Sequence, residues 1–274
     1  MSVDSPHTYK AEIADLYSGR SSTYDNSAWH DRIAKKLVDN ADLKPSSRVL
    51  DIATGTGMVA FYASNLMNQT GSVIGIDISE GMIAVAQEKL RKEKTKNLSF
   101  VIGDGEALEF EPSSFDYIFC SSAFIWMTDL LAALNHWRTL LSANGKLGLH
   151  MFSEKAFVTG AVAQSVLEKY GIEYLMSKPT GTVEKCRELL ETAGYRNINV
   201  IEDKAGTFMT LEEARTSWIT ASHPAPGQFP HPLKNVSPET LAQAREDYEK
   251  EIVKLNTENG VWNDMTTYHV YGEK

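Results

Sequence analysis

The sequence predicts an α/β fold in which helices pack on both faces of a doubly wound, mostly parallel sheet. Three observations lead to this prediction. Between residues 48 and 152, short apolar runs alternate with segments whose apolar residues recur at helical spacing. A Gly-x-Gly turn at 55–57 joins the first apolar run to the first helical segment. The chain has 274 residues, 42% of them hydrophobic, and can therefore bury a core without disulfides or a metal.

The regular region contains five predicted strands and three predicted helices. The strands are the apolar runs at 48–53, 73–77, 98–103, 115–121 and 146–152. The helices lie between them, at 58–68, 80–92 and 129–141. Ser79 is placed to cap the second helix. The repetition of strand, helix and strand predicts right-handed crossovers.

Beyond residue 152 the alternation is less regular. Helices are predicted at 156–170, 182–193, 210–222 and from Ser237-Pro238 onward, a sixth strand at 197–203 and a final strand at 262–271. Gly194 follows the second of these helices as a stop signal, and Thr210 with Glu213 predicts a capping box at the third. A cluster of prolines and glycine at 223–232 predicts a loop.

Composition narrows the class of protein. The formal charge of −9 and the absence of a long Lys/Arg run argue against a nucleic-acid partner. Cys120 and Cys186 have no metal-ligand spacing and favour a reducing compartment. The N-terminal residues do not form a signal peptide, and no apolar run of 18 residues occurs. We expect a cytoplasmic protein without a membrane span, whose oligomeric state the sequence leaves open.

The glycine loop predicts a nucleotide-like cofactor. Gly55, Gly57 and Asp77, which lies 20 residues beyond Gly57, fit the fingerprint of NAD-binding proteins and also a loop for S-adenosylmethionine. Asp51 distinguishes the two cofactors, because it ends the first strand beside the loop. A carboxylate there repels the pyrophosphate of NAD, whereas it attracts the ammonium and sulfonium of S-adenosylmethionine. The charges therefore favour S-adenosylmethionine.

Four motifs in order resemble those of the class I S-adenosylmethionine-dependent methyltransferases. They are DIATGTG at 51–57, GIDIS at 75–79, GDGEAL at 103–108 and FDYI at 115–118. The likeness is strongest to the branch of the ubiquinone/menaquinone C-methyltransferases and many natural-product methyltransferases. It covers residues 15–152 well and 180–203 loosely. It implies a seven-stranded, mostly parallel, Rossmann-like sheet with an antiparallel last strand and helical lid insertions.

The same resemblance implies one methyltransferase domain over residues 1–274. Within this domain we expect an N-terminal helical lid at 1–44, a cofactor-binding core at 45–152, substrate-lid segments at 153–180 and 204–236, and a C-terminal helix with the last strand at 237–274. The length beyond an ordinary domain is thus assigned to lids rather than to a second core.

At the methionine end of the cofactor, the resemblance implies five contacts. Asp51 would bind the ammonium group, and Gly55 and Gly57 would pack against the methionine chain. Tyr24 would fold over this end, and Arg20 would neutralise the carboxylate. The alternative for Tyr24 and Arg20 is a solvated N-terminal helix.

At the adenosine end, Asp77 would bind both ribose hydroxyls and Asp104 would accept from the adenine amino group. Alternatives are a helix cap for Asp77 and a turn for Asp104. Further cofactor contacts are implied for Ala53, Ile78, Met82, Gly105 and Ser121. Ile78 and Met82 would flank the adenine, and Ser121 would line the methyl-donor site. No metal is expected, because no cluster of Asp and His has ligand spacing.

The methyl acceptor should lie beyond the ends of the fourth and fifth strands, since open α/β sheets bind ligands there. Phe124 and Trp126 are the predicted substrate contacts from this region, and His150 is the candidate general base. The alternative for His150 is a hydrogen-bonded core imidazole, and for the two aromatic residues a place in the core. His30 is a weaker candidate base.

Aromatic and Met-rich segments after residue 152, with Tyr174 and Trp218 as predicted substrate contacts, indicate an apolar small molecule as substrate. The expected function is methyl transfer from S-adenosylmethionine to such a molecule, with oxygen favoured over carbon and carbon over nitrogen. Two alternatives stay open: an NAD-dependent oxidoreductase and a non-catalytic S-adenosylmethionine-binding protein.

Overall fold

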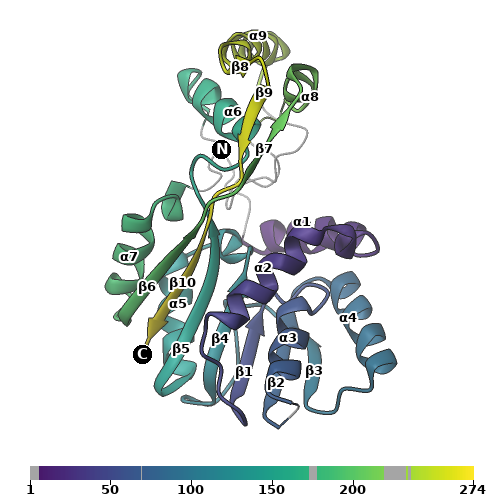
Figure 1. Cartoon of the computed structure of the whole chain (residues 1–274), viewed down its shortest axis with the longest axis vertical. Helices are drawn as coiled ribbons and strands as arrows, with labels where there is room; N and C mark the ends of the chain where they lie inside the picture. The colour runs from purple at the N-terminus through teal and green to yellow at the C-terminus, as the bar shows by residue number, and fades with distance from the viewer. Residues whose placement is uncertain (1–5, 69, 173–177, 219–232, 234–235) are drawn as a thin grey trace.

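A seven-stranded sheet with the order β3-β2-β1-β4-β5-β10-β6 forms the centre of the protein (Figure 1). The computed structural model describes residues 6–68, 70–172, 178–218, 233 and 236–274. The strands are β1 (Arg48–Ile52), β2 (Ser72–Asp77), β3 (Leu98–Ile102), β4 (Phe115–Ser121), β5 (Leu141–Phe152), β6 (Arg196–Asp203) and β10 (Thr267–Glu273). β10 pairs antiparallel with β5 and β6, and the other pairs in this sheet are parallel. The predicted fold class is confirmed.

Helices cover both faces of the sheet, because alternate residues of each strand point to opposite sides. On one face, α2 (Ala28–Asp39), α3 (Met58–Leu66) and α4 (Glu80–Glu93) contribute to an apolar cluster with Val49 and Phe119. On the other face, α5 (Leu130–Leu140) and α7 (Val183–Thr192) pack on Leu50 and Ile118. Ser79 caps α4 as predicted, its side chain accepting from the backbone N–H of Met82.

The N-terminal helix α1 (Pro6–Arg20) lies across the carboxyl edge of the sheet. Within the described residues, short 3-10 helices lie at η1 (Tyr24–Asn26), η2 (Phe124–Trp126) and η3 (Lys178–Thr180). Because α1 crosses the strand ends, it closes one side of the space where an α/β sheet binds its ligands.

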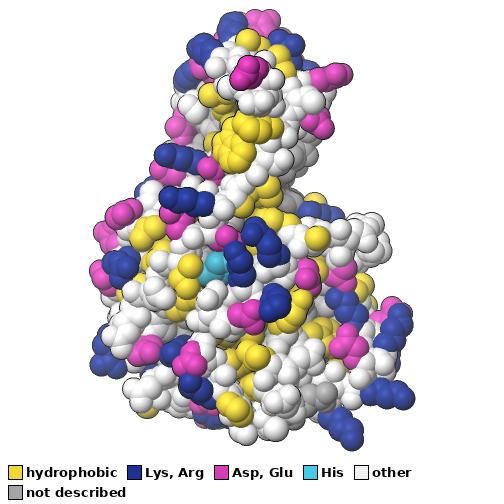
Figure 2. Space-filling view, in the orientation of Figure 1, with side chains coloured by type: hydrophobic (Ala, Val, Ile, Leu, Met, Phe, Trp, Pro, Cys, Tyr) yellow, Lys and Arg dark blue, Asp and Glu magenta, His cyan; other side chains and the backbone are white. Residues whose placement is uncertain are grey.

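A smaller lobe extends beyond the carboxyl ends of β5 and β6 (Figure 1). It contains a three-stranded sheet and three helices: β7 (Gly206–Met209), β8 (Asn256–Thr257), β9 (Gly260–Asp264), α6 (Val158–Lys169), α8 (Leu211–Thr216) and α9 (Pro238–Lys254). Its apolar cluster includes Leu167, Ala214, Tyr248 and Ile252. The additional length thus builds a lobe with its own apolar cluster, where the sequence suggested lid segments alone. On this lobe, the rings of Phe208 and Trp262 contact each other and are about half exposed. Figure 2 shows hydrophobic side chains on the surface of the lobe.

The predicted final strand at 262–271 is two strands in two sheets, and the prediction of one strand was wrong. β9 pairs with β7 and β8 in the lobe, whereas β10 pairs with β5 and β6. Between them, Thr266 accepts from the backbone N–H of Ser153 and Met265 donates to Ala205. The break between β9 and β10 depends on which strands pair with the backbone, so the continuous apolar pattern of the sequence does not reveal it.

The predicted helix at 210–222 ends at Thr216, and residues 219–222 lie outside the described residues.

Gly57 offers a stability test of the glycine loop. It begins α3 at a φ of 91°, and an added Cβ would lie 2.6 Å from Cζ of Phe100. We expect Gly57→Ala to lower the free energy of unfolding by about 3 kcal/mol, since left-handed alanine and overpacking each cost at least about 1 kcal/mol. Gly171→Ala is the matched control, because its φ is 70° but no atom lies within 4 Å of the added Cβ. Urea unfolding should show the larger loss at Gly57; equal losses would contradict the contact with Phe100.

Candidate cofactor and acceptor site

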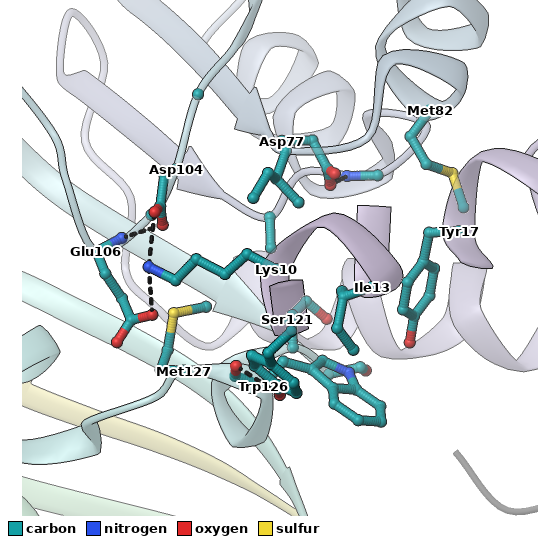
Figure 3. Close-up of a pocket in the computed structure, with 18 of the residues that line it drawn as sticks. Lys10, Ile13, Tyr17, Asp77, Met82, Asp104, Glu106, Ser121, Trp126 and Met127 are labelled. Carbon is teal, nitrogen blue, oxygen red and sulfur yellow. Dashed lines mark hydrogen bonds and ion pairs between the residues drawn. The ribbon is translucent and has the colours of Figure 1, made fainter. Parts of the chain in front are cut away.

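A pocket lies at the carboxyl ends of β1, β2, β3 and β4, beneath α1 (Figure 3). The predicted cofactor residues that line it are Tyr24, Ala53, Gly55, Asp77, Ile78, Met82, Asp104, Gly105 and Ser121. A second pocket adjoins it and adds Asp51 and His30. The two pockets share Tyr24, Ala53, Gly55, Ser121 and Ser122, so they adjoin, and we call the two together the cleft.

Asp77 is held at the end of β2 by the glycine loop. Its two carboxylate oxygens accept hydrogen bonds from the backbone N–H groups of Gly55 and Ser79, both at 2.8 Å. Burial raises the pKa of this carboxyl group, partly offset by these hydrogen bonds. The remaining lone pairs face the pocket that Asp77 lines, where they fit a diol such as ribose.

Asp51 lies deeper, at the end of β1, and is 1% exposed. It accepts from the hydroxyl of Thr54 at 2.5 Å and from the backbone N–H of Ala60 at 3.2 Å. Burial raises its pKa to about 7. A cation bound in the adjoining pocket would favour the charged form, so this carboxyl group fits the cationic end of S-adenosylmethionine.

The pKa of Asp51 predicts a pH dependence of cofactor binding. Because a cation prefers the ionised carboxylate, binding at a pH below about 7 requires loss of a proton, and affinity rises with pH until the group is ionised. We expect the affinity for S-adenosylmethionine to increase about tenfold between about pH 5.5 and 7.5. Titration calorimetry measures this. Asp51→Asn should bind more weakly and without the pH dependence, whereas a flat profile in the unchanged protein would refute the role of Asp51.

Asp104 follows β3 and is bound by a residue that the sequence did not single out. The ammonium of Lys10, on α1, lies 2.6 Å from Asp104 Oδ2 and 2.9 Å from Glu106 Oε2. Glu106 completes this cluster, and its side chain is only 12% exposed. No local signal identifies this cluster, because Lys10 and Asp104 are 94 residues apart in the chain.

Two predicted cofactor residues do not line the described cleft. Gly57 lies against Phe100 and Phe61, so its missing side chain makes room for the core rather than for a ligand. Arg20 lies with its guanidinium 5.5 Å from the ring centre of Tyr17 and is not among the lining residues of either pocket. A role for Arg20 at the methionine carboxylate remains a prediction.

His150 lies directly behind the cleft. It is 1% exposed, and its Nδ1 lies 2.8 Å from the hydroxyl of Ser122, which lines both pockets. Burial holds the pKa of His150 well below its usual value, so the ring is neutral at pH 7. Ser122 has a left-handed φ of 60°, a strained conformation that is often found at functional sites. The predicted base therefore reaches the cleft through Ser122 and does not line it.

His30 lines the cleft itself. Its ring stacks on that of Tyr24 with centres 4.5 Å apart. Burial is the main reason for its lowered pKa, so this imidazole is also neutral at pH 7. Its Nδ1 is buried and has no hydrogen-bond partner.

Aromatic rings continue from the two histidines away from the cofactor cleft. We call Trp29, His30, His150, Phe152 and Phe157 the ring cluster. Trp29 stacks on Phe152 at 5.8 Å between centres and makes edge contacts with the other three rings. Trp29 Nε1, His30 Nδ1 and His150 Nε2 are buried without a hydrogen-bond partner. Buried polar atoms are normally paired, so these three unpaired nitrogens are an unusual feature of the ring cluster.

Of the four residues predicted to contact the substrate, the three that the structure describes lie in different parts of the protein. Phe124 is 1% exposed and packs on Trp137 in the core, so it is not available to a substrate. Trp126 lines the cofactor pocket beneath α1. Trp218 packs on Tyr248 in the apolar cluster of the lobe, and its role as a substrate contact stays a prediction. Tyr174 lies outside the described residues.

The described part of the chain has neither a metal-binding cluster nor a membrane-spanning helix. Among those residues, no group of three or more His, Cys, Asp or Glu side chains could hold a metal ion. In the same residues, no helix is long and apolar enough to cross a membrane.

Together, the sheet order and the acidic cleft at its carboxyl edge define an S-adenosylmethionine-dependent methyltransferase. A family model described as "Methyltransferase domain" matches residues 43–194, more than half of the chain, and the chain belongs to this family. The cofactor is S-adenosylmethionine, and this assignment replaces the NAD alternative.

Individual relatives agree with the predicted branch. Aklanonic acid methyltransferase DauC from Streptomyces sp. (strain C5) is 26% identical over 73% of this chain and 98% of its own length. Demethylmenaquinone methyltransferase from Lactococcus lactis subsp. lactis (strain IL1403) is 30% identical over 49% of this chain and 56% of its own. A putative methyltransferase from Bacillus halodurans C-125 superposes with a TM-score of 0.57 at 18% identity, over 88% of this chain and 98% of that one, which shows likeness of fold.

Proposed function

We propose that this methyltransferase transfers a methyl group to a hydroxyl oxygen of an apolar, aromatic small molecule, such as a secondary metabolite or a quinone-like compound. The observation that carries the proposal is the ring cluster, which combines aromatic rings with three buried, unpartnered ring nitrogens. One of its rings, His150, contacts Ser122 of the cleft. Flat aromatic molecules pack well on such faces. Their oxygen substituents would satisfy the buried nitrogens.

The neutral histidines support oxygen as the methylated atom. S-adenosylmethionine supplies an electrophilic methyl group when it is bound. A hydroxyl group becomes a better nucleophile when a nearby base accepts its proton, and a neutral imidazole can do so at pH 7. In our proposal His150 accepts the proton through Ser122, and His30 is the second candidate. A ring carbon is the next candidate acceptor and an amine the third.

The names of two relatives support a small molecule as the substrate class. The Lactococcus relative is named for a demethylmenaquinone and the Streptomyces relative for an acid, aklanonic acid, so both act on small molecules by name. A nucleic-acid substrate and a membrane partner form no part of the proposal, and the cytoplasmic location remains a prediction.

The test is transfer of isotopically labelled methyl from S-adenosylmethionine to an extract of the source organism, which is then separated into small molecules and macromolecules. We expect label in an aromatic compound, and NMR of the purified product should show the methyl group on oxygen. Label on carbon or nitrogen would contradict the proposed atom. Label in protein or RNA would contradict the substrate class, and cofactor binding without any transfer would favour a non-catalytic protein.

A further inference from the structure

One charged side chain crosses the cofactor pocket. Figure 3 shows Lys10 extending from α1 toward Asp104 and Glu106, on the far side. Its ammonium lies within 3 Å of an oxygen of each carboxylate, at 2.6 Å and 2.9 Å. The side chains of Lys10, Asp104 and Glu106 are 23%, 29% and 12% exposed, so the cluster is only partly screened by solvent.

Glu106 is held in place by hydrogen bonds that do not involve Lys10. Its Oε1 accepts from the backbone N–H and the hydroxyl of Thr128, at 2.9 and 2.7 Å, and from the backbone N–H of Asp129 at 3.1 Å. Its other oxygen, Oε2, is the one that Lys10 contacts. The hydrogen bonds from Thr128, Lys10 and Asp129 outweigh burial and lower the pKa of Glu106, so the group is an anion at neutral pH. Glu106 is therefore a rigid anchor for the ammonium.

Asp104 is held from two sides. Its Oδ1 accepts from the backbone N–H of Glu106 at 2.9 Å, and its Oδ2 accepts from Lys10. A carboxylate oxygen has two lone pairs, so an adenine amino group can bind Asp104 without displacing Lys10. The ammonium thus fixes the orientation of the carboxylate that faces the pocket.

The other end of α1 is attached separately. The hydroxyl of Ser18 lies 2.8 Å from that of Ser79 and accepts from the backbone N–H of Gly81 at 3.3 Å. A Cβ at Gly81 would lie 2.8 Å from Cα of Ser18, so α1 and α4 approach closely there. Lys10 lies about two turns before Ser18, over the opposite part of the pocket.

We propose that Lys10 is a positioning residue of the cofactor site: it orients Asp104 for the adenine and ties α1 over the bound cofactor through Glu106. Release of the cofactor then requires the ammonium to separate from both carboxylates. The proposal concerns the cofactor alone and does not depend on which acceptor is methylated.

The test compares dissociation of S-adenosylhomocysteine from variants by stopped-flow fluorescence. Lys10→Met keeps most of the aliphatic stem and removes the charge, and we expect dissociation to be about tenfold faster. Glu106→Gln should accelerate it by a similar factor, and the double variant should be no faster than the more affected single variant. Lys10→Arg should restore slow dissociation. The control is Lys35→Met, which removes the exposed ion pair with Asp39 on α2 and should leave the rate unchanged.

Two further measurements separate positioning from a general loss of structure. Added salt should speed dissociation from the unchanged protein more than from Lys10→Met, because only the former has the ion pair to screen. In the cofactor-bound state, Lys10→Met should increase hydrogen exchange in α1 and not in β1. The proposal is overturned if Lys10→Met and Glu106→Gln dissociate at the normal rate, if their effects add, or if Lys10→Met binds the cofactor more tightly.

Discussion

Replacement of Asp77 by alanine is expected to weaken binding of S-adenosylhomocysteine by a factor of at least about 30, which is about 2 kcal/mol. The carboxylate already accepts from Gly55 and Ser79, so it is oriented before a ligand arrives. In the bound state two ribose hydroxyls would donate to it, and hydrogen bonds to a charged group are each worth about 1.5–3 kcal/mol. Loss of the carboxylate also releases the backbone of the glycine loop.

Titration calorimetry with two comparison variants isolates the ribose contribution. Asp77→Asn keeps one acceptor oxygen and should lose less affinity than alanine. Asp39→Ala removes an exposed carboxylate on α2 and should bind normally. Unchanged affinity in Asp77→Ala would mean that the ribose binds elsewhere, whereas a lower melting temperature with normal affinity would make Asp77 a cap of α4 only.

Replacement of His150 by alanine is expected to reduce turnover about 100-fold, the lower end of what a general base contributes. Cofactor affinity should change little, because His150 lies behind Ser122 and lines neither pocket. Ser122→Ala interrupts the same path and should reduce turnover as well. Turnover is measured with labelled S-adenosylmethionine and the acceptor identified from the extract.

His269→Ala is the matched control for His150→Ala. His269 faces His150 across β10 and β5 with ring centres 5.2 Å apart, and both are 1% exposed. The two substitutions therefore disturb the core alike, but only His150 contacts Ser122. Equal losses of turnover would indicate a packing effect. A large loss in His30→Ala with normal turnover in His150→Ala would transfer the role of base to His30.

The central sheet could be predicted because its strands are buried on both faces. Runs such as 48–53 and 115–121 are apolar for that reason, and the helices between them keep their apolar stripes and caps. The lobe was not predicted, since α6, α8 and α9 are ordinary amphipathic helices whose sequences do not specify which sheet they cover. The division of residues 262–271 between two sheets was not predicted for the same reason, since the sequence does not specify which strands these residues pair with.

In the site, three carboxylates expected to contact the cofactor lie at or just after the carboxyl ends of strands. Asp51, Asp77 and Asp104 reach the cleft because parallel strands end at the same edge. Phe124 lies in the core, which is the alternative that the sequence left open, because a single residue after a strand can face either the core or the cleft. Lys10 was missed because its position depends on how α1 lies across the sheet.

A crystal structure of the protein with S-adenosylhomocysteine tests the account most directly. We expect the ribose on Asp77, the adenine against Asp104 with Lys10 still paired, and the sulfur directed toward Ser122 and the ring cluster. A nucleoside bound outside this pocket, or a sulfur directed away from Ser122 and His30, would contradict both the cofactor assignment of these residues and the proposed acceptor site.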